Sequence, residues 1–154
     1  MREYSKWPIF IISLPDAEKR RSPLVEALRN SGLRYEIFDA VDGRRGVPFE
    51  YEDMVDVAKM EERFGRLMSD PEIGCALSHI LVYKQITERD LPGALVLEDD
   101  TVWSDAATAL LQELEPGEHD LLQLDCGWAD VWRFIPAQSS GKVGVKLKRL
   151  ARNA

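Results

Sequence analysis

The sequence predicts an α/β domain with a mostly parallel sheet flanked by helices, and three observations favour this class. Short apolar segments rich in β-branched and aromatic residues alternate along the chain with segments of helical spacing. The 154 residues correspond to one domain, which is long enough to bury a core. The content of 45% hydrophobic and 31% charged residues is typical of a soluble globular domain. Ligand sites in such sheets lie beyond the carboxyl ends of the strands.

The first predicted strand is Ile9–Ser13, because this segment is β-branched and aromatic, and Pro15 ends it. The following helix has two candidate starts. Asp16 could cap it, whereas Ser22 followed by Pro23 forms the better pair of N-cap and first-turn residues. We therefore expect the helix to begin at Ser22.

The second predicted strand is Tyr35–Phe38, and the turn of residues 39–43 follows it because Asp-Gly favours a turn. Residues 44–69 show no sustained periodicity, so only a loop with a short helix is expected there. A helix over residues 70–89 comes next. Its predicted start is an aspartate N-cap followed by a proline at the first helical position.

The second half of the chain begins with a predicted strand, Ala94–Leu97, which leads into an acidic triplet. Ser104 is the expected N-cap of the next helix, which ends at Pro116. Leu121–Leu124 is a further predicted strand, and Lys142–Leu147 is a weaker one after a polar turn. We expect no internal repeat and no second domain.

The acidic triplet of Glu98, Asp99 and Asp100 ends the third predicted strand. In an extended segment, Glu98 and Asp100 point to one side and can share a ligand, whereas Asp99 faces the other way. A backbone turn at Asp99 would allow all three to converge. A hard cation such as Mg²⁺ or Mn²⁺ would compensate these charges, and a solvated turn is the alternative. Parallel strands would bring Ser13 and Asp39 to the same edge.

Charge and composition argue against several functions. The net charge is −7 and the basic residues are dispersed, so a nucleic-acid partner is not expected. The two cysteines, Cys75 and Cys126, suggest neither a disulfide framework nor a CxxC zinc site. The apolar run of residues 8–14 is too short to span a bilayer and lacks a signal cleavage site. We therefore expect a cytoplasmic protein, with any membrane contact peripheral.

Four motifs in order resemble glycosyltransferase family 25, the lipooligosaccharide biosynthesis group. They are a first strand followed by an arginine-containing helix, then "AVDG" at 40–43, "EIGCALSH" at 72–79 and "LEDD" at 97–100. Together they extend over about residues 8–103, and the set is far more specific than any one motif alone. The resemblance implies a nucleotide-sugar-binding fold of the glycosyltransferase A type, which is Rossmann-like.

The resemblance also implies a ligand set. Glu98, Asp99 and Asp100 would hold Mn²⁺ or Mg²⁺ against the diphosphate of a UDP-sugar, often UDP-galactose, and the metal would stabilise the departing UDP. The acceptor would be a lipooligosaccharide or another glycan, and a membrane contact would lie at the inner face of the bacterial inner membrane. The residues expected near the donor are Ser13, Arg20, Asp39, Asp42, Gly43, Ser78 and His79.

Two of these assignments have ordinary structural alternatives. Arg20 and its neighbour Arg21 are equally compatible with solvated helix residues. Cys75 and His79 lie four residues apart on one helical face and could bind zinc, but two ligands do not make a site. Packing of the helix against the sheet, with hydrogen bonding by Ser78 and His79, is the favoured interpretation.

The catalytic base is the functional residue that the sequence defines least well. We expect a single domain over residues 1–154 whose donor-binding half is about residues 8–126 and whose later part is short for the family. Asp125 is the better candidate for the base, because it leaves a predicted strand at the ligand edge, whereas Asp120 lies at the other end. Strand-end aspartates are often turn formers.

Three functions follow from these features. The first is metal-dependent transfer of a hexose, galactose in the leading interpretation, from a UDP-sugar to a glycan. The second is binding of a nucleotide sugar or a partner without turnover. The third is a receiver-like phosphoacceptor domain, which is disfavoured because the triplet ends the third strand and only one helix separates Asp100 from Asp125.

Overall fold

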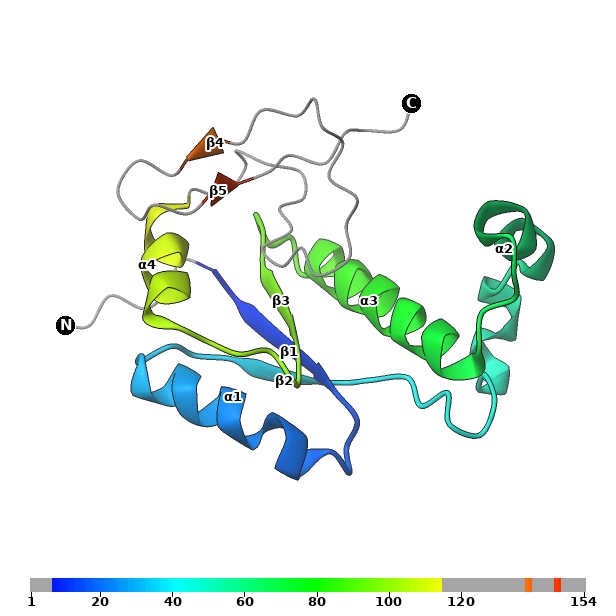
Figure 1. The fold of residues 1–154 in the computed structure, drawn as a ribbon, viewed down its shortest axis with the longest axis horizontal. Helices are drawn as coiled ribbons and strands as arrows, with labels where there is room; N and C mark the ends of the chain where they lie inside the picture. The colour runs from blue at the N-terminus through cyan, green and yellow to red at the C-terminus, as the bar shows by residue number, and fades with distance from the viewer. Residues whose placement is uncertain (1–6, 115–137, 140–145, 148–154) are drawn as a thin grey trace.

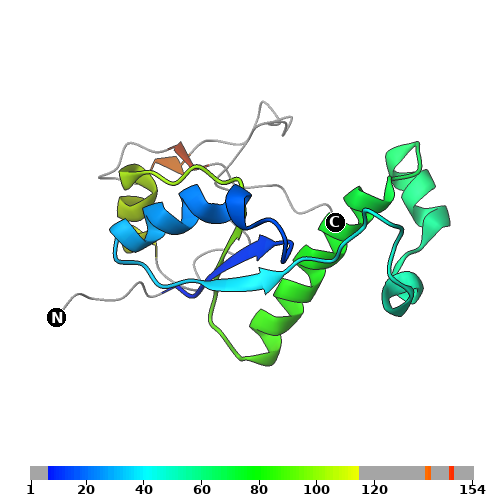
Figure 2. The same cartoon turned by 90° about the horizontal axis from the view of Figure 1, so that it is seen from below.

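The structure is a computed structural model that describes residues 7–114, 138–139 and 146–147. Three strands form an all-parallel sheet in the order β2-β1-β3, with helices on both faces (Figures 1 and 2). The strands are β1 (Ile9–Ser13), β2 (Glu36–Asp39) and β3 (Leu95–Glu98). The predicted α/β class with a parallel sheet is therefore confirmed.

The central strand β1 is buried along its whole length, and its alternating side chains enter two different cores. On one face, Ile9 and Ile11 pack with residues of α1 (Glu18–Asn30) and α4 (Asp105–Glu113). On the other face, Phe10 and Ile12 pack with Val82 of the long helix α3 (Asp70–Glu88). The sheet is thus covered on both sides, as an apolar parallel sheet requires.

Helix α1 begins at Glu18, so the predicted start at Ser22 and Pro23 is wrong. The Ser22 hydroxyl donates to the carbonyl of Glu18 at 2.7 Å, one turn back, instead of capping a new helix. Pro23 lies inside α1, where its missing N–H removes one helical hydrogen bond. The helix ends at Asn30, and Gly32 follows with a φ of +71° in the left-handed region.

The segment without clear periodicity contains a 3₁₀ helix, η1 (Phe49–Met54), and a short α-helix, α2 (Val57–Phe64). The Asp56 side chain caps α2 by accepting from the Lys59 N–H at 3.0 Å. Gly65 ends α2 with a φ of +67°. The expected loop with a short helix is confirmed, and η1 adds to it.

Helix α3 is capped by Ser69, one residue before the predicted N-cap Asp70. The Glu72 carboxylate accepts from the Ser69 N–H at 2.8 Å and from its hydroxyl at 3.0 Å, as in a capping box. Pro71 lies in the first turn, as expected. From this start, which lies against Gly43, α3 runs along one face of the sheet (Figure 1).

The later elements agree with the sequence in part: the start of α4 and the strand near Leu147 are as predicted, whereas Gln138 and Ser139, expected in a polar turn, form a strand. Ser104 caps α4 by accepting from the Ala107 N–H at 3.2 Å, as predicted. The two-residue strands β4 (Gln138–Ser139) and β5 (Lys146–Leu147) pair antiparallel. The predicted strand Leu121–Leu124 lies outside the described residues. Within the described part of the chain, no helix has the length and apolar character needed to cross a membrane.

Candidate functional site

The carboxyl ends of the three strands meet at one edge of the sheet. Ser13 at the end of β1 is in register with Asp39 at the end of β2, and Ile12 is in register with Glu98 at the end of β3. The prediction that Ser13, Asp39 and the acidic triplet share one edge is therefore confirmed. We refer to residues Glu98–Thr101 as the acidic turn.

The backbone turns at Asp99, which is the second of the two conformations considered for the triplet. The Thr101 N–H donates to the Glu98 carbonyl at 3.1 Å and closes the acidic turn. Within this turn Asp99 is buried, whereas Glu98 and Asp100 are exposed. Asp99 therefore has an environment different from that of its two neighbours.

The buried Asp99 carboxylate is compensated through both of its oxygen atoms. The Ser13 hydroxyl donates to Oδ2 at 2.9 Å, and Nε of Arg20 lies 2.9 Å from Oδ1. A carboxylate in this position would be strongly destabilising without such partners. Asp99 thus ties the end of β3 to the end of β1 and to α1.

Arg20 joins two members of the triplet, because its guanidinium also lies 2.7 Å from Oδ2 of the exposed Asp100. The hydrogen bond to Asp100 raises the pKa of Arg20, and the negative charges of Asp99 and Asp100 add to this effect. Arg20 is therefore a fixed positive charge at the acidic turn. Arg20 was expected near the donor, and its ion pairs with Asp99 and Asp100 distinguish it from a solvated helix residue without a partner.

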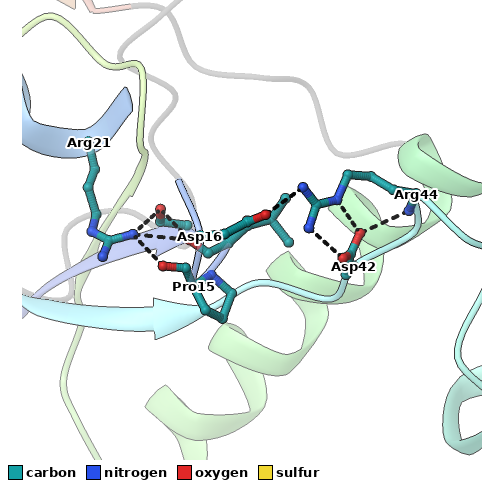
Figure 3. A network of polar contacts seen from close by, with 7 residues as sticks. Pro15, Asp16, Arg21, Asp42 and Arg44 are labelled. Carbon is teal, nitrogen blue, oxygen red and sulfur yellow. Dashed lines mark hydrogen bonds and ion pairs between the residues drawn. The ribbon is translucent and has the colours of Figure 1, made fainter. Parts of the chain in front are cut away.

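Arg21 supports the end of β1 instead of the acidic turn. Its Nη1 donates to the Leu14 carbonyl at 3.0 Å, to the Ser13 hydroxyl at 3.3 Å and to the Pro15 carbonyl at 3.4 Å. Figure 3 shows the Arg21 side chain directed at this segment. The two adjacent arginines of α1 therefore have different partners. Arg20 contacts the carboxylates of the acidic turn, and Arg21 contacts backbone carbonyls after β1.

Helix α3 brings a second group of polar side chains to the edge. Nε2 of His79 lies 3.4 Å from Oε1 of Glu98, and the Tyr83 hydroxyl lies 3.4 Å from His79 Nδ1. One ligand atom each of Cys75, His79 and Glu98 lies within 4.8 Å of the other two. Partial desolvation by neighbouring atoms raises the pKa of the Cys75 thiol, and the charges of Glu98 and Asp100 raise it further.

Cys75 is exposed, so packing against the sheet does not explain it and that expectation is wrong. The residues of α3 that face the cores are others, namely Ile73, Gly74, Leu77, Ser78 and Val82. The side chain of Cys75 instead lies on the same side of α3 as His79, one helical turn away. The thiol belongs to the polar edge and not to the core.

Ser78 is fully buried and holds the loop after β2 by hydrogen bonding. Its hydroxyl accepts from the Val41 N–H at 2.8 Å and donates to the Gly74 carbonyl at 2.7 Å. The bond with Val41 joins residues 37 positions apart in the sequence. The structure therefore places Ser78 under the 40–43 loop as a support, whereas His79 lies at the edge.

Substitution of Ser78 tests this support. Ser78→Ala leaves the buried Val41 N–H without its acceptor, so we expect unfolding to become easier by about 1–3 kcal/mol. Urea denaturation followed by circular dichroism measures the change. Ser22→Ala is the matched control, because among the described residues that exposed hydroxyl bonds its own helix, and a change within about 0.5 kcal/mol is expected. Equal stability of the two variants would contradict the role of Ser78.

The same loop contacts α3 through glycine backbone atoms. A Cβ atom on Gly43 would lie only 2.1 Å from the Asp70 carbonyl oxygen, and one on Gly74 would lie 2.8 Å from the Val41 carbonyl oxygen. Neither distance is compatible with a side chain unless the backbone moves. Gly43 is therefore needed for the approach of the loop to the start of α3.

Asp42 forms a separate ionic group with Arg44 and Asp16 (Figure 3). Asp42 accepts from Arg44 Nε at 2.8 Å and from Nη2 at 2.7 Å, and Arg44 Nη1 donates to Asp16 at 2.8 Å. These bonds lower the pKa of Asp42 to about 2 and raise that of Arg44. Asp16, considered above as a helix cap, instead links the loop after β1 to the loop after β2.

The predicted site residues thus fall into four places. Ser13, Arg20, Asp99 and Asp100 form one network at the edge, and Glu98 with His79 forms a second beside it. Asp39 is exposed at the end of β2, while Asp42, Gly43 and Ser78 belong to the adjoining loop and its support. Asp125 lies outside the described residues. The sequence interpretation missed Arg44, although an arginine two residues after an aspartate in a turn is within reach of it.

Comparison with known proteins gives a direct family match. The model of the family described as Glycosyltransferase family 25 (LPS biosynthesis protein) matches residues 6–148. A Drosophila pseudoobscura "Glycosyltransferase 25 family member" is 31% identical over 130 residues, which are 74% of this chain and 20% of that protein. The Xenopus laevis "Procollagen galactosyltransferase 1-A" is 30% identical over 125 residues, or 78% of this chain and 20% of that protein.

Some relatives are named as inactive. The Mus musculus "Inactive glycosyltransferase 25 family member 3" is 28% identical over 109 residues, which are 69% of this chain and 18% of that protein. The chain thus spans about a fifth of the length of these three relatives. The family match covers most of the chain and includes the strands, α3 and the acidic turn. The chain belongs to glycosyltransferase family 25.

Proposed function

We propose that the protein transfers a hexose, galactose by preference, from a UDP-sugar to a glycan acceptor in a metal-dependent reaction. The observation that carries this proposal is the acidic turn at the carboxyl edge of a parallel sheet in a family 25 chain. The name of the Xenopus laevis relative supports galactose. The family description supports a lipopolysaccharide or lipooligosaccharide acceptor.

The acidic turn offers the donor atoms that Mn²⁺ or Mg²⁺ requires. Both cations prefer oxygen ligands, and the exposed carboxylates of Glu98 and Asp100 provide them. Among the described residues, Glu98 and Asp100 are engaged through one oxygen each, Oε1 and Oδ2, whereas both oxygens of Asp99 are engaged. We therefore assign Glu98 and Asp100 as the ligands and Asp99 as the residue that positions Arg20. A bound metal would neutralise charge on the diphosphate of the departing UDP.

Arg20 is the protein cation that would contact the diphosphate. Its pair with Asp100 is exposed, and such pairs contribute only about 0–1 kcal/mol, so a ligand can displace it. Its bond to the buried Asp99 would remain and keep the guanidinium at the edge. A planar guanidinium binds phosphate oxygens in pairs, so Arg20 would orient the leaving group.

The remaining residues would surround the nucleotide and the acceptor. Asp39 and the 40–43 loop border the edge next to β1, and we propose that they lie along the nucleoside. Asp125 remains our proposed base, which would take the proton of the acceptor hydroxyl. A lipid-linked acceptor would bring the reaction to the cytoplasmic face of the bacterial inner membrane.

A second candidate function is binding of a nucleotide sugar without turnover. One observation favours it: Arg20 already neutralises Asp99 and Asp100, as it would in a protein that needs no metal at this place. In that case the affinity of the edge for UDP would be the same with and without metal. Alternatively, UDP would bind in a metal-dependent way, but the protein would not release UDP from a UDP-sugar.

Calorimetric titration with UDP separates these functions. We expect UDP affinity to rise at least about tenfold when Mn²⁺ replaces a chelator, because the metal joins the carboxylates to the diphosphate. UMP is the control, since it lacks the diphosphate and should show a much smaller effect. UDP-galactose incubated with Mn²⁺ should release galactose or transfer it. Metal-independent UDP affinity would contradict the proposal, and metal-dependent binding without hydrolysis or transfer would favour the second function.

A further inference from the structure

Cys75, His79 and Glu98 form a cluster whose chemistry differs from that of the acidic turn. Cys75 and His79 lie one turn apart on α3, and Glu98 reaches them from the end of β3. One ligand atom of each lies within 4.8 Å of the other two, and His79 Nε2 is 3.4 Å from Glu98 Oε1. Thiolate and imidazole are preferred by Zn²⁺, whereas Mg²⁺ and Mn²⁺ favour oxygen.

The spacing is close to that of a tetrahedral metal site. Metal distances of 2.0–2.3 Å to nitrogen, oxygen and sulfur imply ligand separations of roughly 3.4–3.7 Å. His79 Nε2 and Glu98 Oε1 are already 3.4 Å apart. The Cys75 sulfur lies within 4.8 Å of a ligand atom of each residue, so it must approach by at most about an ångström. Cys75 is exposed, and rotation of its side chain is not blocked by a packed core.

Tyr83 gives the imidazole a suitable orientation. Its hydroxyl lies 3.4 Å from Nδ1 of His79, one turn further along α3. When Nδ1 carries the proton and donates to this hydroxyl, the lone pair of Nε2 is directed toward Glu98. Hydrogen bonding of the remote ring nitrogen is the usual way in which proteins fix a metal-binding histidine.

We propose that Cys75, His79 and Glu98 bind one Zn²⁺ ion, with water or a substrate oxygen in the fourth position. Three protein ligands and one open position are the arrangement found in zinc sites that are not purely structural. Zinc also binds such ligands more tightly than manganese does. Nothing in the family assignment or in the proposed donor site requires a metal at the thiol.

A regulatory consequence follows, and it depends on the proposed function. Glu98 is common to the zinc cluster and to the oxygen ligands assigned to Mn²⁺ or Mg²⁺. A zinc ion held by Cys75 and His79 would withdraw Glu98 from the donor site. Zinc should therefore inhibit metal-dependent UDP binding, and the inhibition should require Cys75.

Cobalt spectroscopy tests the site without any assay of transfer. We expect the reduced 154-residue protein to bind one Co²⁺ with a thiolate-to-cobalt charge-transfer band in the near ultraviolet, and Zn²⁺ to displace it. Cys75→Ser should abolish the band, and His79→Gln should weaken Zn²⁺ binding at least about tenfold. Cys126→Ser is the matched thiol control and should keep the band. A band that survives Cys75→Ser, or wild type without a band, would overturn the site.

Two further variants keep this test separate from that of the donor site. Asp100→Asn should keep the cobalt band although it impairs UDP binding with Mn²⁺. Cys75→Ser should keep Mn²⁺-dependent UDP binding but lose its sensitivity to Zn²⁺. Unchanged UDP affinity in zinc-loaded wild type would overturn the competition for Glu98. A cobalt band in a protein without metal-dependent UDP binding would support the zinc site and contradict the proposed function.

Discussion

Asp100→Asn is expected to weaken Mn²⁺-dependent UDP binding at least about tenfold. The substitution preserves the shape of the side chain but removes one of the two exposed carboxylates that we assign to the metal. It also releases the Arg20 guanidinium from its contact at 2.7 Å, so UDP binding without metal should change little or improve. Titration calorimetry with Mn²⁺ and with a chelator separates the two contributions.

Asp53→Asn is the matched control for this charge change. Asp53 is an exposed aspartate of η1, on a segment that is not part of the sheet edge. The control removes the same formal charge from the protein and should leave UDP affinity within about twofold of wild type, because exposed charges are strongly screened. Equal losses in the two variants would indicate a general charge effect and not a metal ligand.

Gly43→Ala is expected to destabilise the fold by about 3 kcal/mol, which corresponds to a Tm lowered by roughly 6–12 °C. The added Cβ would lie 2.1 Å from the Asp70 carbonyl oxygen and 2.9 Å from Pro71 Cα. Both are backbone atoms, so relief requires the loop to move away from the start of α3. That movement would also strain the Val41 N–H bond to Ser78. Differential scanning calorimetry measures the effect.

Gly65→Ala is the control, since nothing lies within 4 Å of its added Cβ. Its φ of +67° still disfavours alanine, so a loss of only about 1–2 kcal/mol is expected. The difference between the two variants reports the clash of the loop with α3. A Gly43→Ala protein as stable as Gly65→Ala would show that the loop does not depend on this close approach.

The parallel sheet could be predicted from sequence because its signals are local. The β-branched and aromatic composition of Ile9–Ser13 predicts a strand, and this segment is the fully buried central strand. The sequence also predicts Ser104 as the cap of α4, and its side chain makes the expected bond to Ala107. Carboxyl ends of parallel strands share one edge, so the place of Ser13 beside the acidic turn also followed.

Helix starts were harder to predict than strands, because several residues near a helix start can serve as the N-cap. Ser22 with Pro23 has the composition of a helix start, yet α1 begins at Glu18 and continues through both, with the Ser22 hydroxyl bonded back to the Glu18 carbonyl. At α3, the reach of Glu72 back to Ser69 decides in favour of Ser69. A serine followed three residues later by glutamate is a signal that could have identified this cap.

The different burial and partners of Glu98, Asp99 and Asp100 in the acidic turn could not be predicted from the sequence. Whether Asp99 is buried depends on Arg20 and Ser13, which lie 79 and 86 positions earlier and meet it only in the folded protein. The same holds for Glu98 and Cys75, which belong to different elements. The residue types at the edge can be predicted from the strand ends, whereas the packing of α1 and α3 decides which side chain each carboxylate meets.

Crystallography of the protein with Mn²⁺ and UDP tests the central claim most directly. The acidic turn should hold an anomalous manganese peak at roughly 2.1–2.3 Å from carboxylate oxygens of Glu98 and Asp100 and from diphosphate oxygens, as expected for oxygen ligands of a hard cation. Arg20 should then have left Asp100 for the diphosphate while keeping Asp99. UDP bound elsewhere, or bound here without a manganese peak and with Arg20 still on Asp100, would contradict the account.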